Sequence, residues 1–121
     1  MEPKHRGMPD ELIDESLRAV ADPTRRAILR LVRDREVSAG EIALSFPSIS
    51  RPAVSQHLRV LADAGLVAVR PDGNRRLYRW RPEGLRDAAA FLEEMWSDGL
   101  ARLKAAAERN EWPDRARRSL R

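Results

Sequence analysis

The sequence predicts a mainly helical fold with one small β-hairpin. Apolar residues recur at helical spacing before Gly65 and after Pro82, whereas between these two residues they alternate with polar or small residues, as in strands. The turn cluster Pro71-Asp72-Gly73-Asn74 divides the alternating segment into two strands. The chain has 121 residues, 42% of them hydrophobic, so it is long enough to build one core.

Four helices are expected ahead of the hairpin, and a residue suited to capping a helix N-terminus precedes each of them. The first runs from Glu11 to Val20, the second starts at Pro23, the short third follows Ser38, and the fourth runs from Arg51 to about Ala64, with Asp10, Asp22, Ser38 and Ser50 as the respective caps. A fifth helix opens at Pro82 and is expected to reach about Arg109. The break Phe46-Pro47-Ser48-Ile49 joins the third helix to the fourth. Two short helices joined by a tight break and followed at once by a hairpin describe a winged helix-turn-helix.

We expect one domain, residues 10–109, between a flexible N-terminal arm (1–9) and a basic, flexible C-terminal tail (110–121). No apolar run approaches the roughly 20 residues of a membrane span, and the first residues lack the apolar stretch of a signal peptide. A cytoplasmic protein without a membrane partner is therefore expected.

Positive charge is concentrated in one segment. The chain carries a net charge of +4, and residues 51–81 hold seven of its 23 basic residues but only two of its 19 acidic residues. This segment alone therefore carries +5, and the remainder carries −1. Such a patch is typical of a protein that binds a polyanion such as double-stranded DNA, although a solvated charged face would look similar.

The fourth expected helix has the pattern of a DNA-recognition helix. Val54, Leu58 and Leu61 form an apolar stripe at positions i, i+4 and i+7. The polar side chains on the opposite face are Gln56, Arg59 and Asp63, and Arg51 and Ser55 lie beside it. A major groove admits one α-helix, and glutamine, arginine and serine side chains can bind base edges there. On its own, however, the same pattern would fit an ordinary amphipathic helix.

The hairpin supplies a second set of candidate DNA contacts. Arg75 and Arg76 follow its tip, from which they can reach phosphates or the minor groove. Alternatively, some of the hairpin arginines pair with acidic residues of neighbouring helices, and Arg79 and Arg81 are the best placed to do so.

His57 lies about 60° around the fourth helix from the centre of its apolar stripe. It can point into the rim of the groove as a further DNA contact, or form a hydrogen bond within the motif. The only other histidine is His5 and the chain has no cysteine, so we expect no metal site. No nucleophile elbow, phosphate loop or dinucleotide glycine pattern occurs, so we expect neither an enzyme nor a cofactor.

The last expected helix carries a long apolar stripe that suits a dimer. Its members are Leu92, Met95, Trp96, Leu100 and Leu103. A helix of roughly 25 residues at the end of a small domain cannot bury such a stripe against its own chain alone, so a second copy is the natural partner. Ile13 and Leu17 of the first helix could complete that interface. The alternative is packing within one chain.

At these residues the sequence resembles the ArsR/SmtB family of bacterial regulators. The similar stretches are Ala21-Asp22-Pro23-Thr24-Arg25-Arg26-Ala27-Ile28-Leu29, Ser50-Arg51-Pro52-Ala53-Val54-Ser55-Gln56-His57-Leu58-Arg59-Val60-Leu61, Ala64-Gly65-Leu66-Val67 and Arg75-Arg76-Leu77-Tyr78-Arg79. The resemblance spans about residues 12–108. It implies a homodimeric repressor with its first and last helices at the interface, and it implies DNA contacts at Ser55, Gln56 and His57.

The chain departs from the family pattern at the sensor. Metal-sensing members carry a Cys-x-Cys pair where this chain has Ser38 and Gly40, and others use histidine on the last helix, which has none here. The sequence therefore looks like a member that does not sense metals, whose signal would be another molecule, another protein or nothing. A competing hypothesis from another class is a winged-helix module that binds a protein partner through its last helix and binds DNA little.

Overall fold

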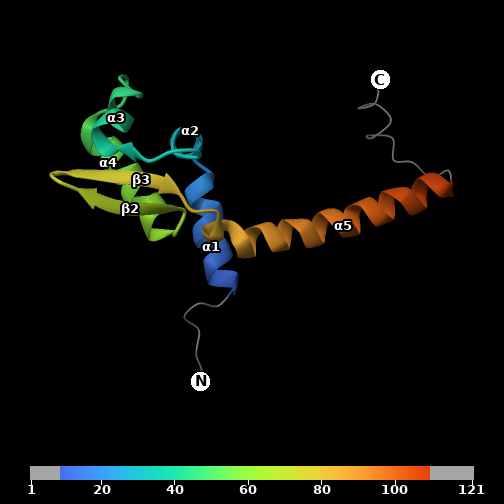
Figure 1. The fold of residues 1–121 in the computed structure, drawn as a ribbon. Helices are drawn as coiled ribbons and strands as arrows, with labels where there is room; N and C mark the ends of the chain where they lie inside the picture. Colours follow the sequence, from blue (N-terminus) through green and yellow to red (C-terminus); the bar gives the residue numbers. More distant parts are fainter. Residues whose placement is uncertain (1–8, 110–121) are drawn as a thin grey trace. The chain divides into compact units, whose positions relative to one another are not determined.

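The computed structural model describes residues 9–109, which fall into two compact units, one reaching to Ala88 and the other starting at Ala89 (Figure 1). The elements are α1 (Pro9–Val20), α2 (Pro23–Leu31), β1 (Val37–Ser38), α3 (Ala39–Leu44), α4 (Arg51–Asp63), β2 (Val67–Asp72), β3 (Arg75–Trp80), the 3-10 turn η1 (Pro82–Leu85) and α5 (Arg86–Glu108). The expected tail and the arm, apart from Pro9, lie outside the described residues. No described helix is long and apolar enough to cross a membrane.

Three of the four expected helix caps are confirmed. Asp22 accepts a hydrogen bond from the Arg25 backbone N–H at 3.0 Å, and Ser50 accepts one from Ala53 at 3.2 Å. Ser38 caps α3 in a capping box with Glu41. These side chains satisfy backbone donors that the first turn of a helix leaves without partners.

The starts of the first helix, α1, and of the last helix, α5, differ from the prediction. Asp10 is not the cap of α1, because the helix already begins at Pro9 and Asp10 lies in its first turn, where a carboxylate suits the helix dipole. Pro82 does not open an α-helix directly. The backbone N–H of Gly84 bonds the Arg81 carbonyl three residues back at 3.1 Å, so the chain forms a 3-10 turn before α5.

The expected two-stranded wing is part of a three-stranded antiparallel sheet in the order β1-β3-β2. Tyr78 of β3 pairs with Val69 on one side and with Val37 on the other. The β1 strand was not predicted because two residues are too few to show an alternating pattern. In addition, Ser38 has two roles, as a strand residue and as the α3 cap.

The core lies in the first unit, between the helices and the sheet. Its largest fully buried side chains come from α2, β1, α3 and α4 and from the residues that directly follow α2 and precede β2. They are Ile28, Val32, Val37, Ile42, Val54, Leu61 and Leu66. The predicted inward stripe of α4 is confirmed, because Val54, Leu58 and Leu61 are all buried. Burial of this stripe fixes which face of α4 is left for solvent.

Two glycines shape the path from α4 to α5. Gly65, predicted as the C-cap glycine of α4, has φ +74°, a conformation that other residues adopt at a cost. Gly84 passes directly over it: a Cβ on Gly84 would lie 2.6 Å from the carbonyl carbon of Gly65 and closer still to its oxygen. The buried Ser16 hydroxyl donates to the Gly84 carbonyl at 2.7 Å, which ties α1 to the same crossing.

The Gly84 crossing should not tolerate a side chain. We expect Gly84→Ala to lower the free energy of unfolding by about 1–3 kcal/mol, because backbone rather than a mobile side chain would have to shift. Gly40→Ala is the matched control: the nearest atom to its Cβ would be Ser38 Oγ at 4.0 Å. That control should leave stability unchanged or raise it by up to about 1 kcal/mol. Urea unfolding measures both variants, and equal stabilities would show that the two backbones are not in contact.

Candidate nucleic-acid interface

A groove between α4 and the sheet brings together three of the predicted DNA-binding side chains. It has a volume of about 410 Å³, and it is lined by Ala39, Ser55, Leu58, Arg59, Ala62, Asp63, Val69, Arg76 and Tyr78. Ser55 and Arg59 stand on the exposed side of α4, and Arg76 reaches the groove from β3. Tyr78, two residues along the same strand, is buried and also lines the groove.

The remaining α4 candidates lie around this groove. Arg51 is the first residue of α4 and is exposed, so its charge lies at the N-terminal end of the helix. Gln56 is also exposed and follows Ser55 on the helix. Exposed polar side chains over two turns of α4 leave the helix free to enter a groove of the duplex, since its apolar side is already buried.

His57 takes the second of the two orientations left open by the sequence. Its side chain is only 19% exposed, and its Nδ1 lies 3.2 Å from Nη1 of Arg25 and 4.0 Å from the Asp22 carboxylate. The ring therefore forms a hydrogen bond within the motif. The DNA contact implied for His57 by the family resemblance stays a prediction.

Two acidic residues neutralise wing arginines. Arg70 of β2 forms a two-pronged ion pair with Glu36, with distances of 2.7 and 2.9 Å. Arg75 binds Asp72 across the hairpin tip at 2.8 Å. These hydrogen bonds from arginine hold the pKa of Glu36 and the pKa of Asp72 below their ordinary values.

Within residues 9–109, Arg79 and Arg81 do not form the ion pairs with neighbouring helices that the sequence left open as an alternative to DNA contact. Arg81 donates to the Gly65 carbonyl at 3.1 Å, and the hairpin arginines that form ion pairs within residues 9–109 are Arg70 and Arg75. The groove is lined by two arginines, Arg59 and Arg76, whose side chains form no ion pair or hydrogen bond within residues 9–109, so both have their donors available.

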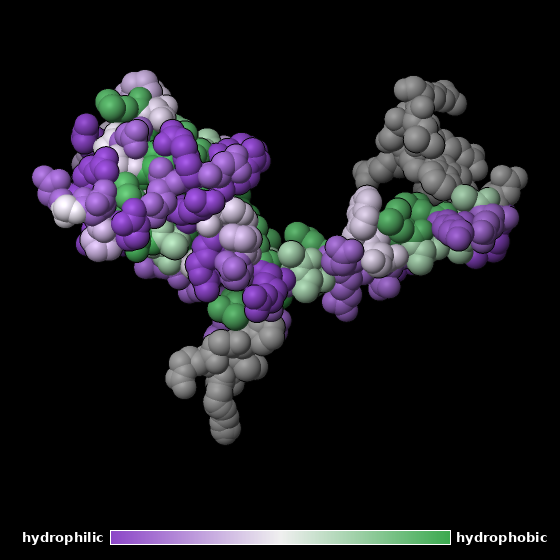
Figure 2. Space-filling view, in the orientation of Figure 1, coloured by the Kyte–Doolittle hydropathy of each residue, from purple (hydrophilic) through white to green (hydrophobic). Residues whose placement is uncertain are grey.

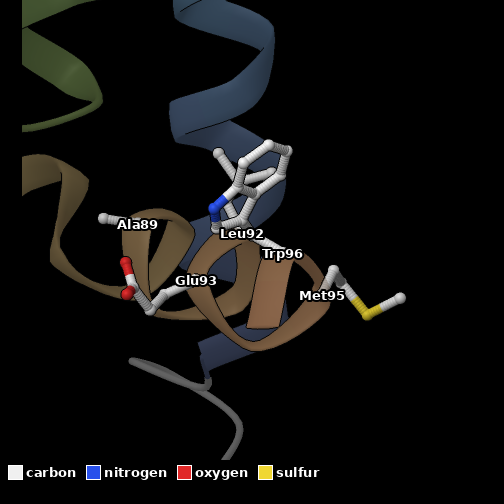
Figure 3. A pocket seen from close by; sticks show the side chains of 5 residues that line it. All are labelled: Ala89, Leu92, Glu93, Met95 and Trp96. Atoms are coloured by element: carbon white, nitrogen blue, oxygen red, sulfur yellow. The ribbon is translucent and has the colours of Figure 1, made fainter. Parts of the chain in front are cut away.

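The stripe expected at a dimer interface is exposed along α5. Phe91 and the predicted residues Leu92, Met95, Trp96, Leu100 and Leu103 are all solvent-accessible, with Trp96 66% and Leu92 54% exposed. Figure 2 shows apolar surface at several places along this helix, between hydrophilic side chains. Leu92 and Trp96, one turn apart, line an open hollow together with Ala89, Glu93 and Met95 (Figure 3).

The first helix contributes less apolar surface than α5. Ile13 is half-buried and Leu17 is 36% exposed, while the inward positions of α1 are taken by Ser16 and Ala19. Both residues of the predicted interface are thus accessible within their own unit, and their role in a dimer stays a prediction.

The sequence interpretation missed the part played by Arg25. Its guanidinium contacts α1, through the carbonyls of Arg18 and Ala19, and α4, through His57. Two features of the sequence could have pointed to Arg25: the helix cap Asp22 lies three residues before it, and His57 lies at the edge of the apolar stripe of α4. Neither feature shows that Arg25 and His57, which are 32 positions apart, form a hydrogen bond.

Comparison with known proteins agrees with this architecture. A family model described as a helix-turn-helix domain matches residues 20–70. The HTH-type transcriptional regulator Rv2034 of Mycobacterium tuberculosis is 45% identical over 87 residues, covering 72% of this chain and 80% of the relative. The transcriptional repressor SdpR of Bacillus subtilis is 37% identical over 75 residues, covering 62% and 82%. The structure of an ArsR-like transcriptional regulator from Rhodococcus sp. RHA1 matches with a TM-score of 0.67 at 29% identity, covering 82% and 92%.

The helix-turn-helix, the wing and these relatives together define a DNA-binding transcriptional regulator of the winged helix-turn-helix class. Within that class, the chain belongs to the ArsR/SmtB family. The resemblance stated from the sequence and the predicted fold class are confirmed.

The Glu36–Arg70 pair gives a test of the wing electrostatics. Because bonding to Arg70 depresses the pKa of Glu36, the pair stabilises the fold above the ordinary glutamate value of 4.5, and this contribution is lost as the pH falls through the lower, folded pKa. Arg70→Gln should therefore move the titration of Glu36 up toward 4.5. Carboxyl NMR measures the shift. Arg75→Gln is the control and should raise the pKa of Asp72 instead; an unmoved Glu36 titration in Arg70→Gln would show that the pair does not form in solution.

Proposed function

We propose that this regulator is a homodimeric repressor that occupies a two-fold symmetric promoter operator, placing α4 in the major groove and the wing on the flanking backbone. The observation that carries the proposal is the groove in which Ser55 and Arg59 of α4 meet Arg76 of β3. Side chains that could bind bases and a cation that could bind phosphate thus lie on one continuous surface. The relatives named as transcriptional regulators and as a repressor support the same conclusion.

In this proposal α4 supplies the sequence specificity. Gln56 can bind adenine through two hydrogen bonds, Arg59 can bind guanine in the same way, and Ser55 can bind either kind of base. Arg51, at the N-terminal end of the helix, is placed to bind a backbone phosphate, where its charge adds to the positive end of the helix dipole.

The wing supplies general affinity. Arg76 has its donors available for phosphate, whereas Arg75 would have to share its guanidinium between Asp72 and the DNA. We therefore place Arg76 ahead of Arg75 as a phosphate contact, although both belong to the proposed interface. Binding of this kind weakens with salt because each phosphate contact releases counterions from the DNA.

The dimer is proposed from the stripe on α5. Monomeric proteins seldom expose contiguous apolar patches beyond a few hundred Å². A two-fold interface would hide the same stripe on both copies at once, and Ile13 and Leu17 of α1 would extend it. Two recognition helices would then contact half-sites about one helical turn apart, about 34–36 Å or a multiple of that distance.

The division of labour between α4 and the wing is testable by mutation. On a duplex selected by the wild-type protein from a random pool, Gln56→Ala should cost about 1–3 kcal/mol and relax specificity. Arg76→Ala should weaken binding to selected and scrambled duplexes alike and reduce the salt slope by about one unit. Arg75→Ala should have the same kind of effect at smaller size. Fluorescence anisotropy at several salt concentrations measures all three, and the assignment fails if Gln56→Ala weakens both duplexes equally.

The dimer is testable at the same stripe. Leu92→Glu or Leu103→Glu should give a helical monomer, because a charge buried without a partner is costly, and operator affinity should fall to the level of scrambled DNA. Ser97→Glu adds the same charge outside the stripe and should leave a dimer. Sedimentation velocity at micromolar protein measures the state of each variant. A monomeric wild type that binds the selected duplex tightly would exclude this dimer, whereas a wild type that binds no DNA would favour the protein-partner hypothesis.

A further inference from the structure

We propose that Arg25 is a positioning residue for DNA recognition: by holding His57, it fixes the rotation of the recognition helix α4 relative to α1 and α2. Arg25 itself need not contact DNA. The inference rests on the proposed function, because rotation of α4 matters only where its side chains bind base edges.

One guanidinium joins three helices. Arg25 lies in the first turn of α2, and its Nε donates to the Ala19 carbonyl at 2.7 Å. Its Nη2 donates to the Arg18 carbonyl at 3.1 Å, and its Nη1 donates to His57 Nδ1 of α4 at 3.2 Å. The planar guanidinium fixes the directions of these donors relative to one another, so its bonds to the end of α1 also set where His57 can lie.

The end of α1 is a rigid support for this arrangement. The last carbonyls of a helix have no partners within it and attract cations. Arg25 binds two of them, and Arg26 binds the next, the Val20 carbonyl, at 2.7 Å. The corner between α1 and α2 is thus held by two arginines, but only Arg25 extends the link to α4.

The link selects one tautomer of the neutral His57 ring. Arginine is always a donor, so Nδ1 of the ring must be the acceptor and the neutral ring must carry its proton on Nε2. Asp22 faces the same nitrogen at 4.0 Å while its carboxylate accepts the Arg25 backbone N–H. That backbone hydrogen bond holds the pKa of Asp22 below its ordinary value, so the carboxylate stays ionised beside the guanidinium.

The bond matters because apolar burial sets which face of α4 is turned inward, whereas a directional hydrogen bond adds a restraint on the exact rotation of the helix. Val54, Leu58 and Leu61 hold the helix through contacts that have no directional preference. Among residues 9–109, the Arg25–His57 bond is the only side-chain hydrogen bond between α4 and either α1 or α2. Gln56 and Ser55 directly precede His57, so a small rotation at His57 moves both away from the base edges, where geometry must hold within about 10–20°.

The main test compares two neighbouring arginines. Arg25→Gln loses the link to α4, whereas Arg26→Gln loses a bond to the end of α1 and no contact with α4. We expect Arg25→Gln to lower the ratio of affinities for a wild-type-selected duplex and a scrambled duplex about tenfold, while affinity for the scrambled duplex stays nearly constant. Arg26→Gln should leave that ratio unchanged. Equal ratios in the two variants would overturn the proposal.

A double-mutant cycle with His57→Ala separates positioning from any DNA contact by His57 itself. If Arg25 acts through His57, Arg25→Gln should have little further effect on specificity in the His57→Ala background. His57→Asn should rescue specificity, because Asn Oδ1 is the same number of bonds from Cα as Nδ1 and accepts the same hydrogen bond. If Arg25→Gln does not fold, the comparison of His57→Ala with His57→Asn still tests the proposal, since both His57 variants keep the bonds from Arg25 to α1. An undiminished effect of Arg25→Gln in the His57→Ala background would overturn the proposal, as would failure of His57→Asn to restore the ratio.

A measurement without DNA distinguishes this inference from the proposed function. Nitrogen NMR of the imidazole at pH 8 should show Nδ1 unprotonated in the wild type and in Arg26→Gln, and a mixture of tautomers in Arg25→Gln. If the wild type does not bind DNA sequence-specifically, the proposed function is wrong whatever the NMR shows. If the His57 tautomer is unchanged in Arg25→Gln, the positioning role of Arg25 is wrong even if the wild type binds DNA specifically.

Discussion

Burial of the stripe on α4 is the constraint on which the rest of the structure depends. Val54, Leu58 and Leu61 can be covered only by turning one side of the helix into the core. That single choice leaves Ser55, Gln56 and Arg59 exposed beside the sheet and places His57 at the boundary between core and solvent. The surface that contacts DNA in our proposal is therefore a direct consequence of hydrophobic burial, and polar contacts only refine it.

Ion pairs make the wing less positively charged than its arginine content suggests. The segment is rich in arginine, yet Glu36 and Asp72 neutralise Arg70 and Arg75 in the free protein. Exposed pairs of this kind contribute little to stability, but they restrain flexible side chains. Among the wing arginines that form no ion pair within residues 9–109, Arg76 is the one that lines the groove beside α4. Arg76 thus adds available positive charge next to the helix that we propose binds the bases.

The sequence predicted features set by neighbouring residues and missed those set by distant ones. The helix caps depend on bonds within a few residues, so their pattern is visible in the sequence itself. These caps are Asp22, Ser38 and Ser50 at helix N-termini and Gly65 after the C-terminus of α4. The strand β1 exists because Val37 pairs with Tyr78, 41 positions away, and the Arg25–His57 bond spans 32 positions. No short-range pattern encodes either contact. The candidate site was predicted as a set of exposed side chains on α4 and the wing. The groove that joins Ser55, Arg59 and Arg76 could be identified only from the packed structure.

These distant contacts have a further consequence for a dimeric repressor. Specific binding to two half-sites requires that each recognition helix keep a fixed geometry relative to the dimer interface. Our proposal places part of that interface on α1, through Ile13 and Leu17. Within the first unit, α1 is joined to α4 by Arg25 and to η1, the turn that leads into α5, by the bond from Ser16 to Gly84. Apolar contacts are not directional, whereas these hydrogen bonds are, so they add directional restraints to the packing of α1 within the first unit. In the dimer that we propose, these bonds would help to keep the interface residues of α1 in a fixed relation to the recognition helix α4.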